Sequence, residues 1–191
     1  MHDFRSAVSA RISEILTTRA PFIDDAIAEA AWKEFVRPAL LLSEAGKRTR
    51  ALLLAAGYEA YEGPGLPVHA GTALELYQLS ALAHDDIIDE SDTRRGLPAI
   101  HRSYATSHRS MSMMGDSTDF GRKAGILSGD YLLSLGALEF EKAEHQDTHA
   151  LTRARTIYHG MTAETAFGQY LDFRAELTAM NNDQASAIQD A

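Results

Sequence analysis

The chain of 191 residues contains no cysteine, so disulfide bonds and thiolate metal sites are excluded. Positive charge is also scarce: 18 lysine and arginine residues stand against 27 aspartate and glutamate residues, which gives a formal net charge of −9. This balance argues against nonspecific binding to nucleic acid or to an anionic membrane surface. No apolar run reaches ~18 residues, and the N-terminus lacks a continuous apolar segment of the signal-peptide type. These absences predict a soluble cytoplasmic protein without a transmembrane segment.

Apolar residues recur at helical spacing along most of the chain. There is no strand-like alternation, and no shift of composition marks a linker between domains. The pattern therefore predicts an all-α fold with some seven helices in a single domain, residues 1–191. The second helix is expected to end at Pro38, and the segment 67–90 is apolar on most faces, which is typical of a buried helix. The expected helical segments are 4–15, 22–38, 50–61, 67–90, a weak helix followed by a polar loop within 96–121, 122–143 and 148–180.

The longest apolar segment ends in the stretch "ALAHDDIIDESDTRRG", which gathers charges of both signs. Asp85 and Asp89 are four residues apart and share a helix face at about 5–6 Å, and Asp86 is adjacent. Carboxylates this close repel each other unless a positive charge lies between them, and their hard oxygen atoms suit Mg²⁺. His84 could indicate zinc, but no second histidine lies at a helical ligand spacing from it. A solvated acidic helix end is the alternative interpretation.

Two basic clusters accompany these aspartates. Arg94 and Arg95 follow within a few residues, and a planar guanidinium binds phosphate in bidentate fashion. The stretch "GKRTR" places Lys47 and Arg50 just before a helix, whose first N–H groups suit an anion. The alternatives are weak surface salt bridges of the arginines and an ordinary charged loop. Together with the long apolar helices, the carboxylates and both basic clusters suit an amphiphilic substrate with a diphosphate head and a hydrocarbon tail.

With these motifs the sequence resembles the trans-isoprenyl diphosphate synthases, or polyprenyl synthetases, from about residue 38 to residue 173. The matching pieces occur in the family's order: "GKRTR", "ELYQLSALAHDDIID", "TRRG", "GILSGDYLLSLGA" and "FGQYLDF". The resemblance implies an isoprenoid synthase-type helical bundle around a central cavity, a homodimer and Mg²⁺ as cofactor. It implies that isopentenyl diphosphate is condensed with an allylic diphosphate, which is dimethylallyl, geranyl or farnesyl diphosphate. Terpene cyclases share the aspartate motif and the all-α fold, but they lack the GKxxR and RRG pieces.

The resemblance also assigns roles to individual residues. Arg94 would contact the allylic diphosphate. The Mg²⁺ that bridges to this diphosphate would be held by Asp85, Asp86 and Asp89. Isopentenyl diphosphate would be bound by Lys47, Arg50, Gln78 and Arg95. The allylic side of the cavity would also be lined by Gln169 and Asp172.

Product length in the family is limited by residues upstream of the aspartate motif. The positions four and five before Asp85 are the small residues Ala81 and Ser80. Tyr77 lies eight residues before Asp85, about 12 Å along the helix axis, where it would form the floor of the tunnel. These residues imply a product of the geranylgeranyl class, and a somewhat longer one is also compatible with them. The alternative is that Tyr77 packs in the core, away from the tunnel.

One family feature does not occur before Ala191: a second aspartate-rich motif, preceded by a lysine-containing segment. The expectation is therefore a bundle without its C-terminal helices, with half of the metal site and poor turnover. Three explanations are open. The chain is a fragment of a full enzyme, a noncatalytic or regulatory partner subunit of a full-length synthase, or an inactive truncated form.

Overall fold

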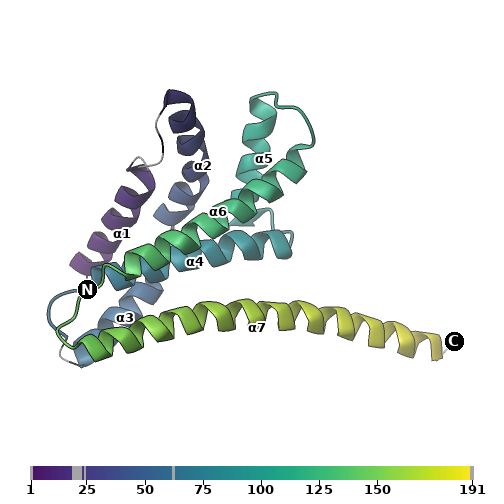
Figure 1. Ribbon diagram of the computed structural model, residues 1–191. Helices are drawn as coiled ribbons and strands as arrows, with labels where there is room; N and C mark the ends of the chain where they lie inside the picture. Colours follow the sequence, from purple (N-terminus) through teal and green to yellow (C-terminus); the bar gives the residue numbers. More distant parts are fainter. Residues whose placement is uncertain (1, 19–22, 24, 62, 190–191) are drawn as a thin grey trace. The chain divides into compact units, whose positions relative to one another are not determined.

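The structure is a computed structural model that describes residues 2–18, 23, 25–61 and 63–189, with side chains as far as residue 178. The described chain forms seven helices and one short hairpin, which confirms the predicted all-α class. It divides into two compact units, residues 1–143 and 144–191. The elements in chain order are α1 (His2–Thr17), α2 (Ala26–Glu44), α3 (Thr49–Ala60), α4 (Val68–Ile88), β1 (Thr93–Arg94), β2 (Leu97–Pro98), α5 (Ile100–Ser110), α6 (Ser117–Phe140) and α7 (Thr148–Gln189) (Figure 1).

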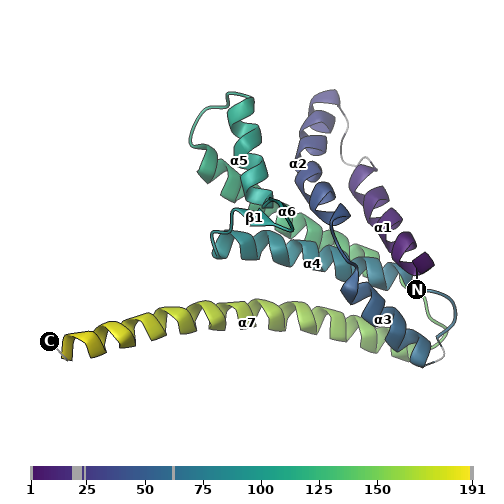
Figure 2. The ribbon, with the colours of Figure 1, turned by 180° about the vertical axis from the view of Figure 1, so that it is seen from behind.

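Helix α4 lies at the centre of the first unit, as its apolar sequence predicts. It packs along α6, and it also contacts α1 and α3 (Figures 1 and 2). The core face of α1 repeats every four residues, so its apolar side chains lie on one side of the helix. At the base of α4, Gly71 lets the ring of Phe4 approach the helix backbone, since a Cβ there would lie 2.7 Å from the ring. The buried stripe of α1 consists of Phe4, Val8, Ile12 and Leu16.

Helix α2 does not end at Pro38, so that prediction is wrong. The Asp25 side chain caps its start by accepting the Ala28 N–H at 2.7 Å. Proline removes one helix hydrogen bond and costs about 3 kcal/mol in a helix interior. Tertiary packing offsets this cost, because Leu42 beyond the proline is 1% exposed. In the disturbed turn, the Tyr104 hydroxyl of α5 donates a hydrogen bond to the Phe35 carbonyl.

Between α4 and α5 the chain makes a reversal that the sequence did not predict. Glu90 adopts φ +52°, and the Ser91 N–H donates to the Asp86 carbonyl at 2.9 Å, which is a Schellman end to α4. Strands β1 and β2 then pair with Arg94 opposite Leu97. The two residues between them, Arg95 and Gly96, have φ values of +56° and +76°. Positive φ at both positions is the signature of a type I′ turn, which matches the twist of paired strands.

Helix α6 begins at Ser117, five residues before the expected position at residue 122. Asp116 explains the earlier start, because its carboxylate accepts the Asp119 N–H at 2.7 Å and caps the helix. Gly121 then allows a close approach to α5, since a Cβ there would lie 2.4 Å from the His101 carbonyl oxygen. The loop before α6 is therefore shorter than predicted, and α5 is held tightly against α6.

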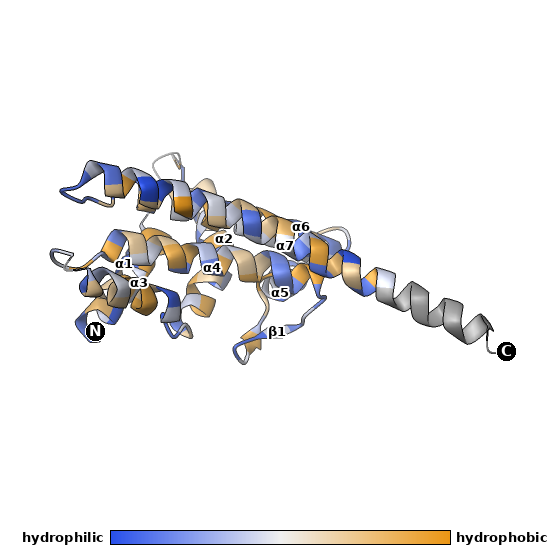
Figure 3. Ribbon diagram, turned by 90° about the horizontal axis from the view of Figure 1, so that it is seen from below, coloured by the Kyte–Doolittle hydropathy of each residue, from blue (hydrophilic) through white to orange (hydrophobic). Residues whose placement is uncertain are grey.

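The second unit contains the long helix α7. Asp147 caps its start by accepting the N–H groups of His149 at 2.9 Å and Ala150 at 3.0 Å. The helix runs to Gln189, beyond the predicted end near residue 180. Hydrophobic and hydrophilic residues are mixed along it (Figure 3). No helix among the described residues combines the length and the apolar character that crossing a membrane requires.

Candidate functional site

The three aspartates of the charged stretch lie at the C-terminal end of α4 in different environments. Asp86 is fully buried, and the side chain of Asp85 is about one-third exposed. Asp89 is the C-cap residue of α4 and is exposed. The Schellman end therefore directs the acidic side chains to the point where the hairpin begins.

Arg94 of β1 supplies the positive charge that neighbouring carboxylates require. Its Nε donates to Asp86 Oδ1 at 2.7 Å, and its Nη2 lies against the same oxygen and 3.3 Å from Asp85 Oδ2. The hydrogen bond to Asp86 raises the pKa of the Arg94 guanidinium above its usual value. Arg94 thus pairs with Asp85 and Asp86 rather than with the acidic residues nearer to it in the sequence, Glu90 and Asp92.

The aspartates have the chemistry of a Mg²⁺ site. Asp86 Oδ2 is buried and has no hydrogen-bond partner, which is unusual for a carboxylate oxygen. Mg²⁺ takes one or two carboxylates together with phosphate oxygens, and this orphaned oxygen beside Asp85 suits such a cation. In the described part of the chain, no three acidic or histidine side chains converge as a preformed metal site. The residues fit the ion, and the assignment of the three aspartates as its ligands stays a prediction.

The "GKRTR" stretch forms the turn between α2 and α3 and the first two residues of α3, Thr49 and Arg50. Lys47 and Arg50 are exposed, and within the described residues neither forms an ion pair. Arg48 between them is 3% exposed and adopts φ +59°. Its guanidinium folds back over Gly46, where a Cβ would lie 2.2 Å from Nη1, so glycine is needed at that position. The turn therefore presents alternate basic side chains outward and inward.

Arg95 connects the hairpin to this turn. Its Nη1 donates to the Leu42 carbonyl at the end of α2 at 3.1 Å and lies 3.0 Å from the Cβ position of Gly46. A turn residue with φ +56° is normally glycine or asparagine, and an arginine there carries a cost of order 1 kcal/mol. The structure thus brings Arg95 to the basic turn, whereas its neighbour Arg94 pairs with the aspartates.

The remaining predicted residues lie on two helices. On α4, Gln78 is half-buried, Tyr77 and Ser80 are buried, and Ala81 is half-buried. Gln78 is one turn from Glu75, which contacts α3, and so lies on a similar face of α4. Gln169 and Asp172 lie on α7 in the second unit, and their role at the site stays a prediction.

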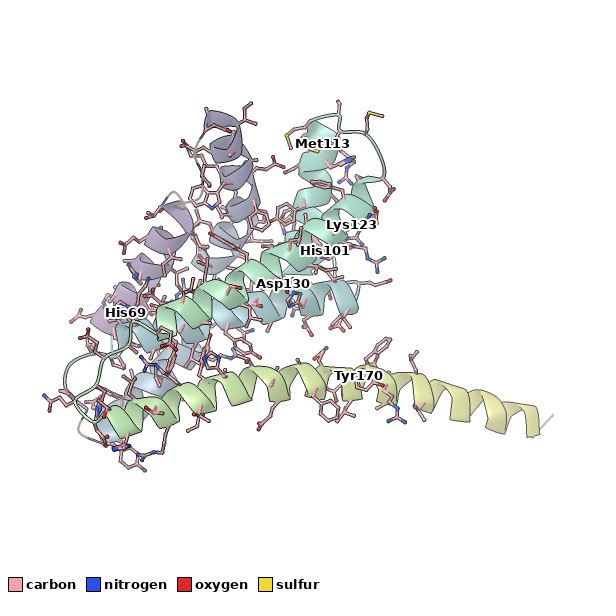
Figure 4. All side chains as sticks on the ribbon, in the orientation of Figure 1. His69, His101, Met113, Lys123, Asp130 and Tyr170 are labelled. Atoms are coloured by element: carbon pink, nitrogen blue, oxygen red, sulfur yellow. The ribbon has the colours of Figure 1, made fainter. Side chains whose placement is uncertain are left out.

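His84 contacts α6 rather than the aspartates that follow it. Its Nε2 lies 3.3 Å from Asp130 Oδ1 and 3.3 Å from the Ile126 carbonyl oxygen. Both partners belong to α6, on which Asp130 is labelled in Figure 4. The ring also fills the space beside Gly129, where a Cβ would lie 2.3 Å from Nε2. His84 therefore connects α4 to α6 next to the aspartates.

Two residues near the basic turn were missed in the sequence. Arg48 and Glu75 are both buried, with Nη1 and Oε2 3.8 Å apart. A carboxylate in an otherwise apolar helix was the available indication, because a buried acid needs a partner. Its partner could not be chosen from the sequence, since any of the nearby basic residues fits.

Comparison with known proteins gives the relatives of this chain. A model of the polyprenyl synthetase family matches residues 35–189. A geranylgeranyl diphosphate synthase from Methanosarcina mazei is 30% identical over 174 residues, 90% of this chain and 45% of that protein. A heptaprenyl diphosphate synthase component 2 from Geobacillus stearothermophilus is 41% identical over 78 residues, 40% of this chain and 23% of that protein.

A solved structure agrees with these relatives. The crystal structure of geranylgeranyl pyrophosphate synthase from Corynebacterium glutamicum, complexed with isoprenyl diphosphate and magnesium, has a TM-score of 0.78 and 34% identity. The match covers 92% of this chain and 51% of that one. The chain belongs to the polyprenyl synthetase family, and its helices form the helical bundle of that family. It spans about half the length of the curated relatives it matches.

Proposed function

We propose that the chain serves as a trans-prenyltransferase, which condenses isopentenyl diphosphate with an allylic diphosphate and is Mg²⁺-dependent. The observation that carries this proposal is the pair of adjacent arginines in the hairpin. Arg94 contacts Asp85 and Asp86, while Arg95 contacts the end of α2 beside Gly46. One short turn therefore connects an acidic site and a basic site. A condensing enzyme needs such a pair of neighbouring sites, because it holds two diphosphates at once.

The acidic side receives the allylic diphosphate in this proposal. Asp85, Asp86 and Asp89 would hold Mg²⁺, which would supply Lewis-acid stabilisation of the leaving diphosphate. The guanidinium of Arg94 already lies against two of these carboxylates, so it is within reach of a phosphate that they help to hold. Gln169 and Asp172 of α7 are assigned to the allylic diphosphate by the family resemblance alone.

The basic side receives isopentenyl diphosphate. Lys47 and Arg50 are exposed on either side of the buried Arg48, and Arg95 approaches the same turn. Gln78 lies on α4, one helical turn from Glu75. Fixed positive groups stabilise the charge that develops when the allylic C–O bond ionises. The double bond of isopentenyl diphosphate then attacks the allylic cation, and loss of a proton completes the condensation, with the departing diphosphate as the base.

The proposed product is of the geranylgeranyl class. Ser80 and Ala81 are too small to block a growing chain, and a helix position eight residues before Asp85 places Tyr77 about 12 Å deeper. Tyr77 is buried, as the floor of a hydrocarbon tunnel would be, and burial is also what a core position would show. Product length after its replacement distinguishes the two.

The test is incubation with Mg²⁺, farnesyl diphosphate and labelled isopentenyl diphosphate. Arg94→Gln is expected to lower kcat about 100-fold, the size of effect seen when one charge-stabilising donor is removed. Arg95→Gln is expected chiefly to raise KM for isopentenyl diphosphate. Arg109→Gln is the matched control, since Arg109 is exposed on α5 and donates only to Ser117 and Thr106 in the described structure. Equal losses in all three variants would contradict the proposed roles.

A second candidate is a noncatalytic partner of a full-length synthase, and the similarity to a heptaprenyl diphosphate synthase component 2 favours it. The same incubation is therefore repeated with a complete synthase added. Product made by the chain alone supports the enzyme, and a change of rate or product only in the mixture supports the partner subunit. Binding of farnesyl diphosphate by titration calorimetry, with and without Mg²⁺, supplies a readout that does not depend on turnover. Sedimentation of the same sample tests the proposed homodimer.

A further inference from the structure

Glu75 is a buried carboxylate that none of the roles above uses. It lies in the middle of α4 and is 5% exposed. A buried charge without a partner costs several kcal/mol, so the partners of Glu75 indicate what it holds in place. Its Oε1 accepts the Ala51 N–H at 3.2 Å, and its Oε2 lies 3.8 Å from Arg48 Nη1.

Both partners belong to the start of α3. Arg48 is the N-cap residue of this helix but provides no side-chain cap, and Ala51 lies in its first turn. Glu75 therefore supplies, from a different helix, the acceptor that a capping side chain normally supplies. Arg48 is also tied to α1, because its Nε donates to Ser9 Oγ at 3.0 Å. The turn is thus fixed to α1 and to α4 at the same time.

The inward position of Arg48 determines what its neighbours do. Arg48 is buried while Lys47 and Arg50 are exposed, and its guanidinium shares the space over Gly46 with that of Arg95. Burial lowers the pKa of Arg48, the charge of Glu75 raises it, and the like charge of Arg95 lowers it. Glu75 is the carboxylate that contacts Arg48 and offsets this like charge.

We propose that Glu75 and Arg48 are positioning residues, which fix the places of Lys47, Arg50 and Arg95 around one diphosphate. This inference rests on the proposed function, because it assigns the turn to isopentenyl diphosphate. Neither Glu75 nor Arg48 contacts the substrate. Glu75 acts through Arg48 and the first turn of α3, and it keeps the basic side chains in one arrangement.

The sign of one effect separates positioning from simple electrostatics. Glu75→Gln removes a negative charge beside a basic cluster, so charge alone would strengthen the binding of an anion. Positioning has the opposite consequence, because Arg48 loses its counter-ion and the turn loses its fixed geometry. We therefore expect Glu75→Gln to weaken the binding of isopentenyl diphosphate about tenfold, although it removes a negative charge from beside the basic cluster.

The experiment measures Kd for isopentenyl diphosphate by titration calorimetry and amide hydrogen exchange at the start of α3, both on the full chain. Glu75→Gln keeps an acceptor for the Ala51 N–H, whereas Glu75→Ala removes it. Only the alanine variant is expected to lose protection of that amide. Glu139→Gln is the matched control, because it also removes a buried carboxylate with basic partners but is hydrogen-bonded to Arg11 and Lys142 instead. Its Kd is expected to equal that of the wild type.

Each result has one meaning. Weaker binding in both Glu75 variants, with an unchanged Glu139→Gln, supports the inference. If the wild type binds isopentenyl diphosphate and Glu75→Gln binds it equally well or more tightly, the inference is overturned and the proposed function stands. An equal loss in Glu139→Gln also overturns it, because the effect is then one of general stability. A wild-type chain that does not bind isopentenyl diphosphate overturns the proposed function and, with it, this inference.

Discussion

Replacing Glu139 by glutamine is expected to destabilise the first unit by an amount that depends on pH. Glu139 is fully buried at the end of α6, and three basic side chains contact it. Arg11 of α1 donates to both of its oxygens at 2.7 and 3.0 Å. His69 Nδ1 of α4 lies 2.7 Å away, and Lys142 Nζ lies 2.9 Å away (Figure 4). One carboxylate therefore joins α1, α4 and α6.

The magnitude follows from the pKa of this carboxyl group. Burial alone would raise the pKa of Glu139, but the hydrogen bonds from Arg11, His69 and Lys142 outweigh burial and lower it from 4.5 to about 2. That difference corresponds to roughly 3 kcal/mol of unfolding free energy at neutral pH. The side chains of His69 and Lys142 are 43% and 52% exposed, so solvent screening reduces the expected value to about 2 kcal/mol.

The sign of the pH dependence is set by the lower pKa of the folded state. The stabilisation is complete above about pH 5 and is lost as the pH falls from about 4.5 toward 2. At pH 3.5 the unfolded chain has taken up most of a proton and the folded chain little of one. About 1 kcal/mol of the stabilisation is then gone. Glu139→Gln lacks this titration, so its difference from the wild type becomes smaller in acid.

Urea unfolding followed by tryptophan fluorescence measures this difference. Trp32 is the single tryptophan, and it is 7% exposed on α2 within the same unit. Glu14→Gln is the control, because Glu14 also pairs with Arg11, at 2.9 Å, but is 62% exposed and should contribute under about 0.5 kcal/mol. A loss of unfolding free energy in Glu139→Gln that is no larger than in Glu14→Gln at pH 7 would refute this prediction. An equal loss of unfolding free energy in Glu139→Gln at pH 7 and pH 3.5 would also refute it.

Other replacements test the packing and the product. Gly121→Ala is expected to lower the unfolding free energy by about 1–3 kcal/mol, because its Cβ would meet the His101 carbonyl. The control Gly57→Ala, with open space around it in α3, should raise the unfolding free energy by up to about 1 kcal/mol. Thermal unfolding measures both. Tyr104→Phe should cost about 1 kcal/mol in the same measurement, since it removes the hydrogen bond to the Phe35 carbonyl. Tyr77→Ala should lengthen the prenyl product seen by chromatography of labelled material, and an unchanged length would place Tyr77 in the core.

The helices of this chain were predictable because their apolar faces repeat. Phe4, Val8 and Ile12 recur every four residues, and all three are buried on one face of α1. The end of α2 was not predictable in the same way. Pro38 is a local indication of a helix end, whereas the packing of Leu42 and the hydrogen bond from Tyr104 are tertiary effects that come from other parts of the chain. The hairpin could not be predicted, because strands of two residues are too short to show alternation.

The sequence supplies the residue types of the proposed site but not the contacts between them. Aspartates and arginines near one helix end suggest a metal and a phosphate, and the binding of both stays a prediction. That Arg94 and Arg95 contact different elements follows from the turn between β1 and β2, and no local pattern pointed to that turn. The sequence does not distinguish Arg48 from the other basic residues of its stretch, because a left-handed backbone has no sequence signature outside glycine and asparagine.

The two-residue turn between β1 and β2 also limits how the gene can change in length. Its central residues are Arg95 and Gly96, and Arg94 immediately before them pairs with α4. One inserted or deleted codon would change the turn type and reverse the faces on which the two arginines lie. Natural variants and engineered libraries should therefore reject length changes at this hairpin.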